Sequence, residues 1–349
     1  MKFGLFILPS WSTDSKHEQS RILGEAVEQA QYAEELGFDA VWLAEHHFCR
    51  FGIVPNAISM GLYVAAKTKK IRIGTAVSVL TFHNPIFAAE ETALLDALSG
   101  GRLDFGVGRG QVVYEYGNFG VDYDTRTEKF GEILDIIIGL WTQSGFTYHG
   151  KFYQVDDLTV APSPVQQPHP PLYMAVSRTP ASIDAAVERN LPILTSPSTP
   201  DADTLEIVHS YYERCAAAGK SPMVEQMPFF RMVYLSDDQQ QAEEDPRHAM
   251  TWVHDLNGLR RTLIGGSEIY MDLDQWRNTR SEQPPTYESL LESTAYFGTP
   301  DRIVKKIEKL RDEHGIQYFG ANMSYGSMEH SRVMRSMELF AKEVMPHFK

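Results

Sequence analysis

Short apolar runs alternate with longer amphipathic stretches from one end of the chain to the other. The short runs are rich in β-branched and aromatic residues, which predicts strands, and the longer stretches carry apolar residues at helical spacing. One predicted helix, Pro85–Leu98, begins with proline and is followed by Gly100-Gly101, the usual start and stop signals. The runs that predict strands are Phe3–Leu8, Phe38–Leu43, Ile71–Leu80, Leu103–Val107, Leu172–Val176, Pro192–Thr195, Phe229–Leu235 and Tyr318–Met323.

Eight alternations of strand and helix favour a parallel α/β fold, and this number suits a closed (β/α)8 TIM barrel better than an open sheet. Two stretches break the alternation. Gly145–Pro171 contains Tyr148–Tyr153, which predicts a hairpin, and then five prolines. Asp245–Phe297 is too long for an ordinary connection, so it is either functional or a surface elaboration without a role. We expect one barrel domain over residues 1–349 with an insertion at about 245–297.

The charge balance narrows the class of partner. The 349 residues include 32 Lys and Arg against 46 Asp and Glu, a formal net charge of −14, which argues against nucleic acid as the main partner. No apolar run approaches the ~18 residues of a membrane span, and the first residues lack the pattern of a secretory signal. The two cysteines, Cys49 and Cys215, cannot form a disulfide framework. We expect a cytoplasmic protein that binds neither nucleic acid nor membranes.

Candidate catalytic residues follow the second predicted strand, because a barrel of this kind places its active site at the carboxyl ends of its strands. The chain there reads Glu45-His46-His47, and His83 follows the third strand. Histidines and carboxylates are common metal ligands, but adjacent residues of an extended segment point to opposite sides, and no aspartate follows the eighth strand. A general acid–base histidine, oriented by Glu45 or another neighbour, fits better than a metal site. The remaining alternative is a histidine that is merely hydrogen-bonded at a strand end.

A candidate ligand-binding surface follows the fourth and fifth predicted strands. In Gly106–Gly110 the glycines alternate, which clears one face for a flat ligand, and Arg109 is suited to a phosphate. Ser177–Pro180 offers hydroxyl and amide groups just before a predicted helix, a favourable place for an anion. A structural ion pair of Arg109 and simple helix capping by Ser177 and Thr179 are the alternatives.

Several segments, taken in order, resemble the bacterial luciferase-like flavin-dependent monooxygenase family. The most specific is Gly37–Phe48, and the resembling segments run from Phe3 to Tyr325, nearly the whole chain. Each motif alone is weak, whereas the ordered set is specific. The further segments are Ile73–Val77, Asn84–Glu90, Leu95-Asp96, Ser99–Arg102, Gly108–Gly110, Phe119–Asp122 and Gly298–Pro300.

The resemblance implies a cofactor and a reaction. Members of this family take reduced FMN from a separate flavin reductase and use O₂, through a flavin 4a-hydroperoxide, so we expect oxygenation of a small, largely apolar organic substrate. His46 matches the catalytic histidine of the family, with His47 and Glu45 in support. Relatives carry a non-proline cis peptide beside the isoalloxazine, at the place of Ala76-Val77.

The resemblance also implies the residues that hold FMN. Arg109, Arg126 and Ser177 match the phosphate site, and Glu90 matches a residue that contacts the flavin ring or its ribityl chain. The full set that it implies is Ala76, Val77, Glu90, Gly108, Arg109, Arg126, Met174, Ala175 and Ser177. Luciferase itself has a cysteine near the reactive flavin carbon where this chain has Gly108, and a Glu-Ser pair where it has Val176-Ser177. Both departures weaken any expectation of light emission.

By the same resemblance we expect a homodimer, no metal, and a mobile lid formed by the insertion at about 245–297. The side chains expected to form the pocket walls are Phe6, Trp42, Phe48 and Tyr114, with ordinary core packing as the alternative for each. Three alternative functions remain at this point. They are a non-catalytic flavin-binding protein, a deazaflavin-dependent oxidoreductase in the same barrel, and a metal-dependent barrel hydrolase.

Overall fold

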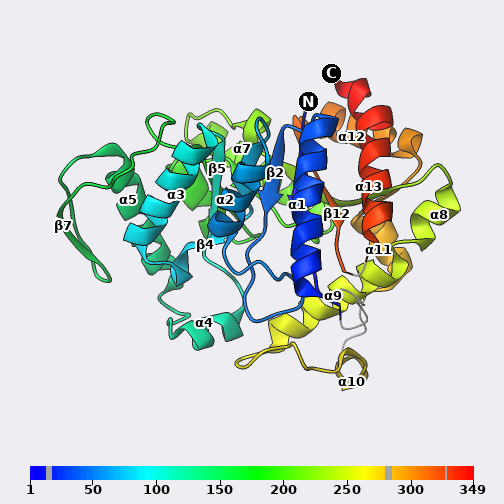
Figure 1. Cartoon of the computed structure of the whole chain (residues 1–349), viewed down its shortest axis with the longest axis horizontal. Helices are drawn as coiled ribbons and strands as arrows, with labels where there is room; N and C mark the ends of the chain where they lie inside the picture. Colours follow the sequence, from blue (N-terminus) through cyan, green and yellow to red (C-terminus); the bar gives the residue numbers. More distant parts are fainter. Residues whose placement is uncertain (13–17, 280–284, 327) are drawn as a thin grey trace.

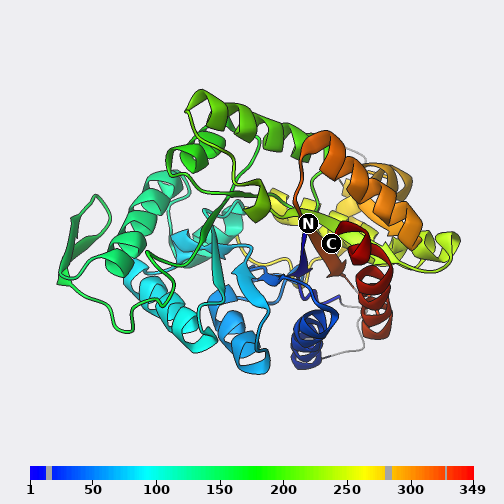
Figure 2. The same cartoon turned by 90° about the horizontal axis from the view of Figure 1, so that it is seen from above.

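Parallel strands form the centre of the molecule and helices surround them (Figures 1 and 2). The computed structural model describes residues 1–12, 18–279, 285–326 and 328–349. The strands neighbour one another in the order β11-β10-β12-β1-β2-β3-β5-β8-β9, and within the described residues no ladder joins the two ends of this path. The strand bounds are β1 Lys2–Ile7, β2 Ala40–Leu43, β3 Arg72–Thr75, β4 Ser78–Val79, β5 Leu103–Gly108, β8 Leu172–Ala175, β9 Ile193–Leu194, β10 Phe229–Leu235, β11 Ala295–Gly298 and β12 Tyr318–Ser324. All eight predicted strands are present, and the fold is the (β/α)8 barrel-like α/β fold expected from the sequence.

Helix α3 Pro85–Ser99 begins at the predicted proline and ends before the predicted Gly100. The Asn84 side chain caps α3 by accepting from the backbone N–H groups of Ile86 and Phe87, and Gly100 ends the helix in the left-handed conformation. The surrounding helices are α1 Gln19–Leu36, α2 Ala57–Lys67, α3 Pro85–Ser99, α5 Arg126–Thr142, α6 Pro180–Glu188, α7 Asp201–Ala217, α12 Pro300–His314 and α13 His330–Leu339. In the part of the chain that the structure describes, no helix combines the length and the apolar character needed to cross a membrane.

Aromatic side chains fill the barrel interior. Trp42 on β2 is fully buried, and its Nε1 donates a hydrogen bond of 2.8 Å to the hydroxyl of Tyr318 on β12. A Cβ atom at Gly4 or Gly74 would collide with the Trp42 ring, so these strands can carry only glycine there. The interior is therefore a packed core, and the cavity described below lies at the carboxyl ends of the strands.

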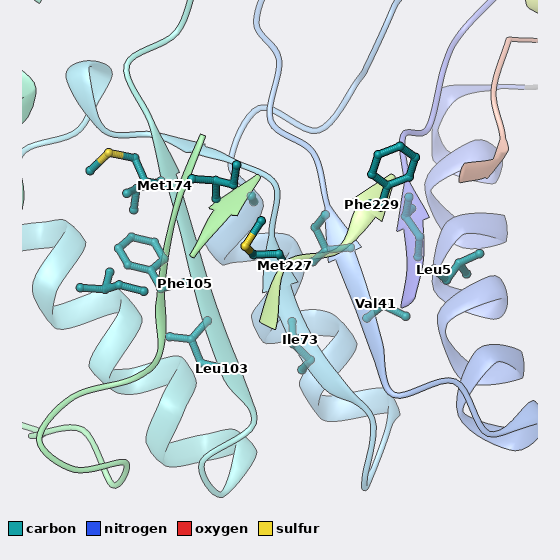
Figure 3. Packing of buried hydrophobic residues seen from close by; sticks show 14 of the residues in the cluster. Leu5, Val41, Ile73, Leu103, Phe105, Met174, Met227 and Phe229 are labelled. Atoms are coloured by element: carbon teal, nitrogen blue, oxygen red, sulfur yellow. The ribbon is translucent and has the colours of Figure 1, made fainter. Parts of the chain in front are cut away.

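A second apolar layer lies between the strands and the helices (Figure 3). Leu5, Val41, Ile73 and Phe105 contribute to it from successive strands of the barrel. Because side chains alternate between the two faces of a strand, the residue after each of these positions points inwards. This alternation decides which side chain of each strand can reach the site.

Two segments lie outside the regular alternation. The hairpin predicted within Gly145–Pro171 is confirmed as antiparallel β6 Phe146–His149 and β7 Gln154–Leu158, which project from one side of the molecule (Figures 1 and 2). The insertion expected at about 245–297 contains α9 Arg247–Thr262, α10 Leu273–Thr279 and α11 Tyr287–Ser293; residues 280–284 of it lie outside the described residues. Its last residues belong to β11, a strand that the sequence analysis did not predict. Helix α4 Val113–Phe119 and helices α9 and α10 lie on the side of the molecule opposite the two chain ends (Figure 1).

Candidate active site

A cavity of about 410 Å³ opens where the carboxyl ends of the strands meet α9. Glu45 and His46, which follow the second predicted strand, and Arg109, which follows the fourth, line it together with Asn257, Arg260 and Arg261 of α9. The helix of the predicted insertion is therefore one wall of this cavity. Its apolar walls are Phe6, Leu8, Phe51, Val79, Val112, Val176, Leu194 and Phe230.

His46 and His47 point to opposite sides, as their adjacency predicts. His46 lines the cavity and is partly accessible from it, and its Nδ1 lies 3.3 Å from Nη2 of Arg260. His47 is buried away from the cavity, with its ring packed edge-on against Phe82 and Phe119. Burial and the nearby charge of Arg260 hold the pKa of His46 well below its ordinary value. Both effects favour the neutral imidazole of His46 over the cation.

Glu45 organises the surrounding chain and does not contact His46. Its carboxylate accepts from the backbone N–H groups of Ala57 at 3.1 Å and Val79 at 3.0 Å, and from His83 Nε2 at 2.9 Å. The Nε2 atom of His47 lies 3.4 Å away, longer than a good hydrogen bond. Burial alone would raise the pKa of Glu45, but the hydrogen bonds and the charge of the neighbouring histidines lower it to about 2. The sequence analysis left open whether Glu45 or another neighbour orients His46. The structure favours another neighbour, Arg260.

Arg260 and Glu115 form a buried ion pair that the sequence analysis missed. Both residues are almost fully buried, and Arg260 Nη2 lies 3.0 Å from Glu115 Oε1. The Nε atom of Arg260 lies 3.4 Å from the Tyr114 hydroxyl, which in turn donates to the His47 carbonyl at 3.1 Å. Glu115 was recognisable only as a lone carboxylate between two tyrosines, and Arg260 has no local signal, because its partners lie 145 and 214 residues away.

The wall opposite α9 is built from small residues. The peptide between Ala76 and Val77 is cis, as the resemblance implies, and both residues line the cavity with Gly108 and Ala175. A Cβ atom at Gly108 would lie 2.7 Å from Cγ2 of Val77, so this strand end lies directly against the Ala76-Val77 segment. Position 106 requires glycine for a different reason, because a Cβ atom there would collide with the backbone carbonyl of Thr75. Of the two strand glycines, Gly108 alone lines the cavity.

A candidate anion-binding set, formed by Arg109, Arg126 and Ser177, lies near one end of this wall. The guanidinium of Arg109 donates to the Thr127 hydroxyl at 2.8 Å, and burial together with the like charge of Arg126 lowers its pKa. Within the described residues neither arginine is paired with a carboxylate, which argues against a structural ion pair. Ser177, whose hydroxyl lies 3.0 Å from that of Thr179, contributes hydroxyl groups at the start of α6. Two neighbouring cations without an anion, beside hydroxyls at a helix N-terminus, fit the phosphate of FMN.

Not every expected residue lines the cavity. Met174 is buried in the outer apolar layer with Phe105 (Figure 3), because it lies one residue out of phase with Ala175 on β8. Glu90 and Arg126 are also not among the residues that line it: Glu90 is half-buried on α3, and the Arg126 guanidinium stacks on the Tyr123 ring at 3.6 Å. Of the four expected wall residues Phe6, Trp42, Phe48 and Tyr114, Phe6 lines the cavity and the other three do not.

Comparisons with known proteins show the family to which the chain is similar. The model of the luciferase-like monooxygenase family matches residues 1–317. The oxygenase component of a flavin-dependent trigonelline monooxygenase from Acinetobacter baylyi is 31% identical over 245 residues, which cover 70% of this chain and 67% of that protein.

Two solved structures share the fold over the whole chain. Monooxygenase RslO1 from Streptomyces bottropensis is 26% identical, with a TM-score of 0.87 over 100% of both chains. The oxygenating constituent of 3,6-diketocamphane monooxygenase from Pseudomonas putida, solved in complex with FMN, is 19% identical, with a TM-score of 0.82 over 100% of this chain and 99% of that one.

Proposed function

The chain belongs to the luciferase-like monooxygenase family of flavin-dependent enzymes, and we propose that it is the oxygenase component of a two-component system. In this proposal a separate flavin reductase supplies reduced FMN in the cytoplasm, and the enzyme uses O₂ to oxygenate a small, largely apolar organic substrate. The name of the Acinetobacter baylyi relative as an oxygenase component supports a separate reductase. The single observation that carries the proposal is that one cavity joins His46, the Ala76-Val77 and Gly108 wall, and Arg109 with Ser177.

In this proposal some residues of the chain bind the flavin and others exclude water from it. When bound, reduced FMN supplies the electrons that activate O₂. Arg109, Arg126 and Ser177 would hold its phosphate, and Ala76, Val77, Gly108 and Ala175 would lie along its ring. The apolar walls exclude water, and His46 offers a polar N–H group next to the place of reaction. Met174 and Glu90 have no part in this assignment.

Replacing Arg109 with alanine is expected to raise the Kd for FMN by about 10- to 100-fold, because a charge-assisted hydrogen bond contributes about 1.5–3 kcal/mol. Quenching of flavin fluorescence during titration measures the Kd. The matched control is Arg189→Ala, which removes a guanidinium paired with Asp135 on the outer surface. Equal FMN affinity in Arg109→Ala and in the unmodified protein would show that the phosphate does not bind at this end of the cavity.

A reductase-coupled assay under ¹⁸O₂ tests the reaction itself. The protein, a flavin reductase, NADH and FMN are incubated with a panel of aldehydes, ketones, terpenes and N-heteroaromatic compounds, and products are analysed by mass spectrometry. The proposal expects a product with one ¹⁸O atom that requires both reduced FMN and O₂. A product formed without O₂ would favour the deazaflavin-type oxidoreductase, and tight binding of FMN without any acceleration of O₂ chemistry would favour a flavin-binding protein.

We also propose that the enzyme is a homodimer that pairs through α2 and α3. Phe87, Leu94 and Leu98 lie on one face of α3 and are 65%, 39% and 68% exposed, and Tyr63 on the adjacent α2 is 54% exposed. A continuous apolar face of this kind on a folded chain marks a protein interface.

Leu98→Glu is expected to shift the particle mass from twice the chain mass to the chain mass at micromolar concentration, because it places a charge in the apolar interface. Light scattering after size exclusion measures this. Ile264→Glu changes an apolar, 83% exposed residue that follows α9 and is expected to leave the mass unchanged. A dimer that survives Leu98→Glu together with Phe87→Glu would place the interface elsewhere.

A further inference from the structure

We propose that Arg260 is a positioning residue that holds His46 as the neutral tautomer with its proton on Nε2, so that His46 acts as a hydrogen-bond donor to the cavity. The proposal rests on the proposed function in one respect only, the role of His46 in the reaction. It extends that function by assigning a task to a helix outside the eight-strand barrel, since Arg260 belongs to α9.

The tautomer follows from the contact on Nδ1. Arg260 Nη2 lies 3.3 Å from His46 Nδ1, and a guanidinium can only donate. Nδ1 must therefore accept, which leaves the imidazole proton on Nε2. The Nε2 atom makes no hydrogen bond with any described residue, and His46 lines the cavity, so this donor is available to a bound molecule. The group that it recognises is an acceptor oxygen of the substrate or of the activated O₂.

Arg260 is held in place from three sides. Glu115 on α4 accepts from the same Nη2 atom at 3.0 Å, and Tyr114 lies 3.4 Å from Nε. The guanidinium also stacks over the ring of Phe51, 4.7 Å from its centre. Glu115 additionally accepts from the backbone N–H of His47 at 3.4 Å, so the ion pair is tied to the segment that carries His46. These contacts fix the position of the Arg260 side chain, and in that position it donates a hydrogen bond to His46.

The surroundings also keep His46 from becoming a cation. The charged and titratable groups near it are Arg260 and Arg261 on α9, Tyr114 and Glu115 on α4, and Glu45, His47 and Cys49 in its own loop. Burial and the charges of Arg260 and His47 lower the pKa of His46, and Glu45 raises it by less. The hydrogen bond and the charge of Arg260 thus act in the same direction, towards a neutral donor.

Two-bond ¹H–¹⁵N correlation spectra of the protein labelled in histidine test this directly, because they distinguish the two neutral tautomers and the cation. His46→Gln assigns the His46 signals by their absence. In the unmodified protein we expect the pattern of a neutral ring protonated at Nε2, unchanged from about pH 6 to pH 8, around the ordinary histidine pKa of ~6.5. A ring protonated at Nδ1, or one that titrates in this range, overturns the proposal. This result needs neither substrate nor turnover, so it stands apart from the fate of the proposed function.

The variant Arg260→Met/Glu115→Gln removes the donor without leaving a buried carboxylate unpaired. We expect its His46 signals to shift from a single Nε2–H tautomer to an average over the two neutral tautomers, and coupled oxygenation to fall about 10²-fold in kcat, with the Kd for FMN within about twofold. The control Arg261→Met removes the neighbouring guanidinium and leaves the Arg260–His46 hydrogen bond in place, so it is expected to keep the tautomer. An unchanged tautomer in the double variant overturns the role of Arg260. If the double variant does not fold, the spectra of the unmodified protein still decide the tautomer.

Discussion

Replacing His46 with alanine is expected to lower the yield of oxygenated product by about 10²- to 10⁴-fold, the usual contribution of a positioned proton-transfer or hydrogen-bonding group. The loss follows from the geometry, because His46 is the imidazole that lines the cavity while His47 faces an aromatic cluster. The proposed phosphate contacts of Arg109 and Ser177 are untouched, so FMN should bind as before. Product and hydrogen peroxide are measured together, and consumption of O₂ should continue with peroxide as its main product.

The comparison with His46→Gln separates the donor role from a loss of packing. A glutamine amide can present an N–H group near the position of Nε2, so it should retain more product formation than alanine. Unchanged coupled turnover in His46→Ala would exclude His46 from the reaction. Equal, large losses in both variants would mean that the donor on Nε2 is not what matters.

Replacing Glu45 with alanine is expected to cost about 3–5 kcal/mol of the free energy of unfolding, as removal of one partner of a buried ion pair does. Glu45 is 2% exposed and joins the start of α2, β4 and His83 through three hydrogen bonds. Without it, the backbone N–H groups of Ala57 and Val79 have no acceptor. Denaturation by urea measures the loss. Glu45→Gln keeps one acceptor oxygen and should cost less.

The ion pair of Glu45 and His83 also determines how the free energy of unfolding depends on pH. The folded pKa of Glu45 is about 2 against 4.5 for the free side chain, so its stabilisation is present above pH 4.5 and is lost as the pH falls towards 2. Burial lowers the pKa of His83, but the hydrogen bond and charge of Glu45 raise it on balance. Its contribution is present below 6.5 and is lost as the pH rises through the raised value. The stability difference between the unmodified protein and Glu45→Gln should therefore be largest between these limits; a difference independent of pH would contradict the ion pair.

The sequence predicts the part of the site that lies at strand ends. Residues such as His46, Gly108 and Ser177 follow strands whose carboxyl ends must meet, so their convergence follows from the fold class. Met174 shows the limit of this reasoning, since a strand places adjacent side chains on opposite faces and a shift of one residue moves the side chain out of the cavity. The role of Arg260 could not be predicted in this way. Its contact with His46 depends on how α9 crosses the barrel, which no local pattern encodes.

Part of the fold, too, could be predicted from the sequence and part could not. Eight strands were predicted, whereas β11 was missed because Ala295–Gly298 lies at the end of the stretch that the sequence analysis took as an insertion. The hairpin β6–β7 was predictable from its local sequence. The packing of α9 against the mouth of the barrel was not, because it is fixed by buried contacts between distant segments such as Arg260 with Glu115.

Rapid mixing tests the central claim, that this cavity binds reduced FMN and controls its reaction with O₂. The protein loaded with reduced FMN is mixed with oxygenated buffer in the absence of substrate, and the absorbance of oxidised flavin is followed. Because a closed, apolar site suppresses side reactions, we expect oxidised flavin to appear at least roughly tenfold more slowly than from free reduced FMN, with a distinct slow final phase. Reoxidation at the rate of free FMN, in a single phase, would contradict the account.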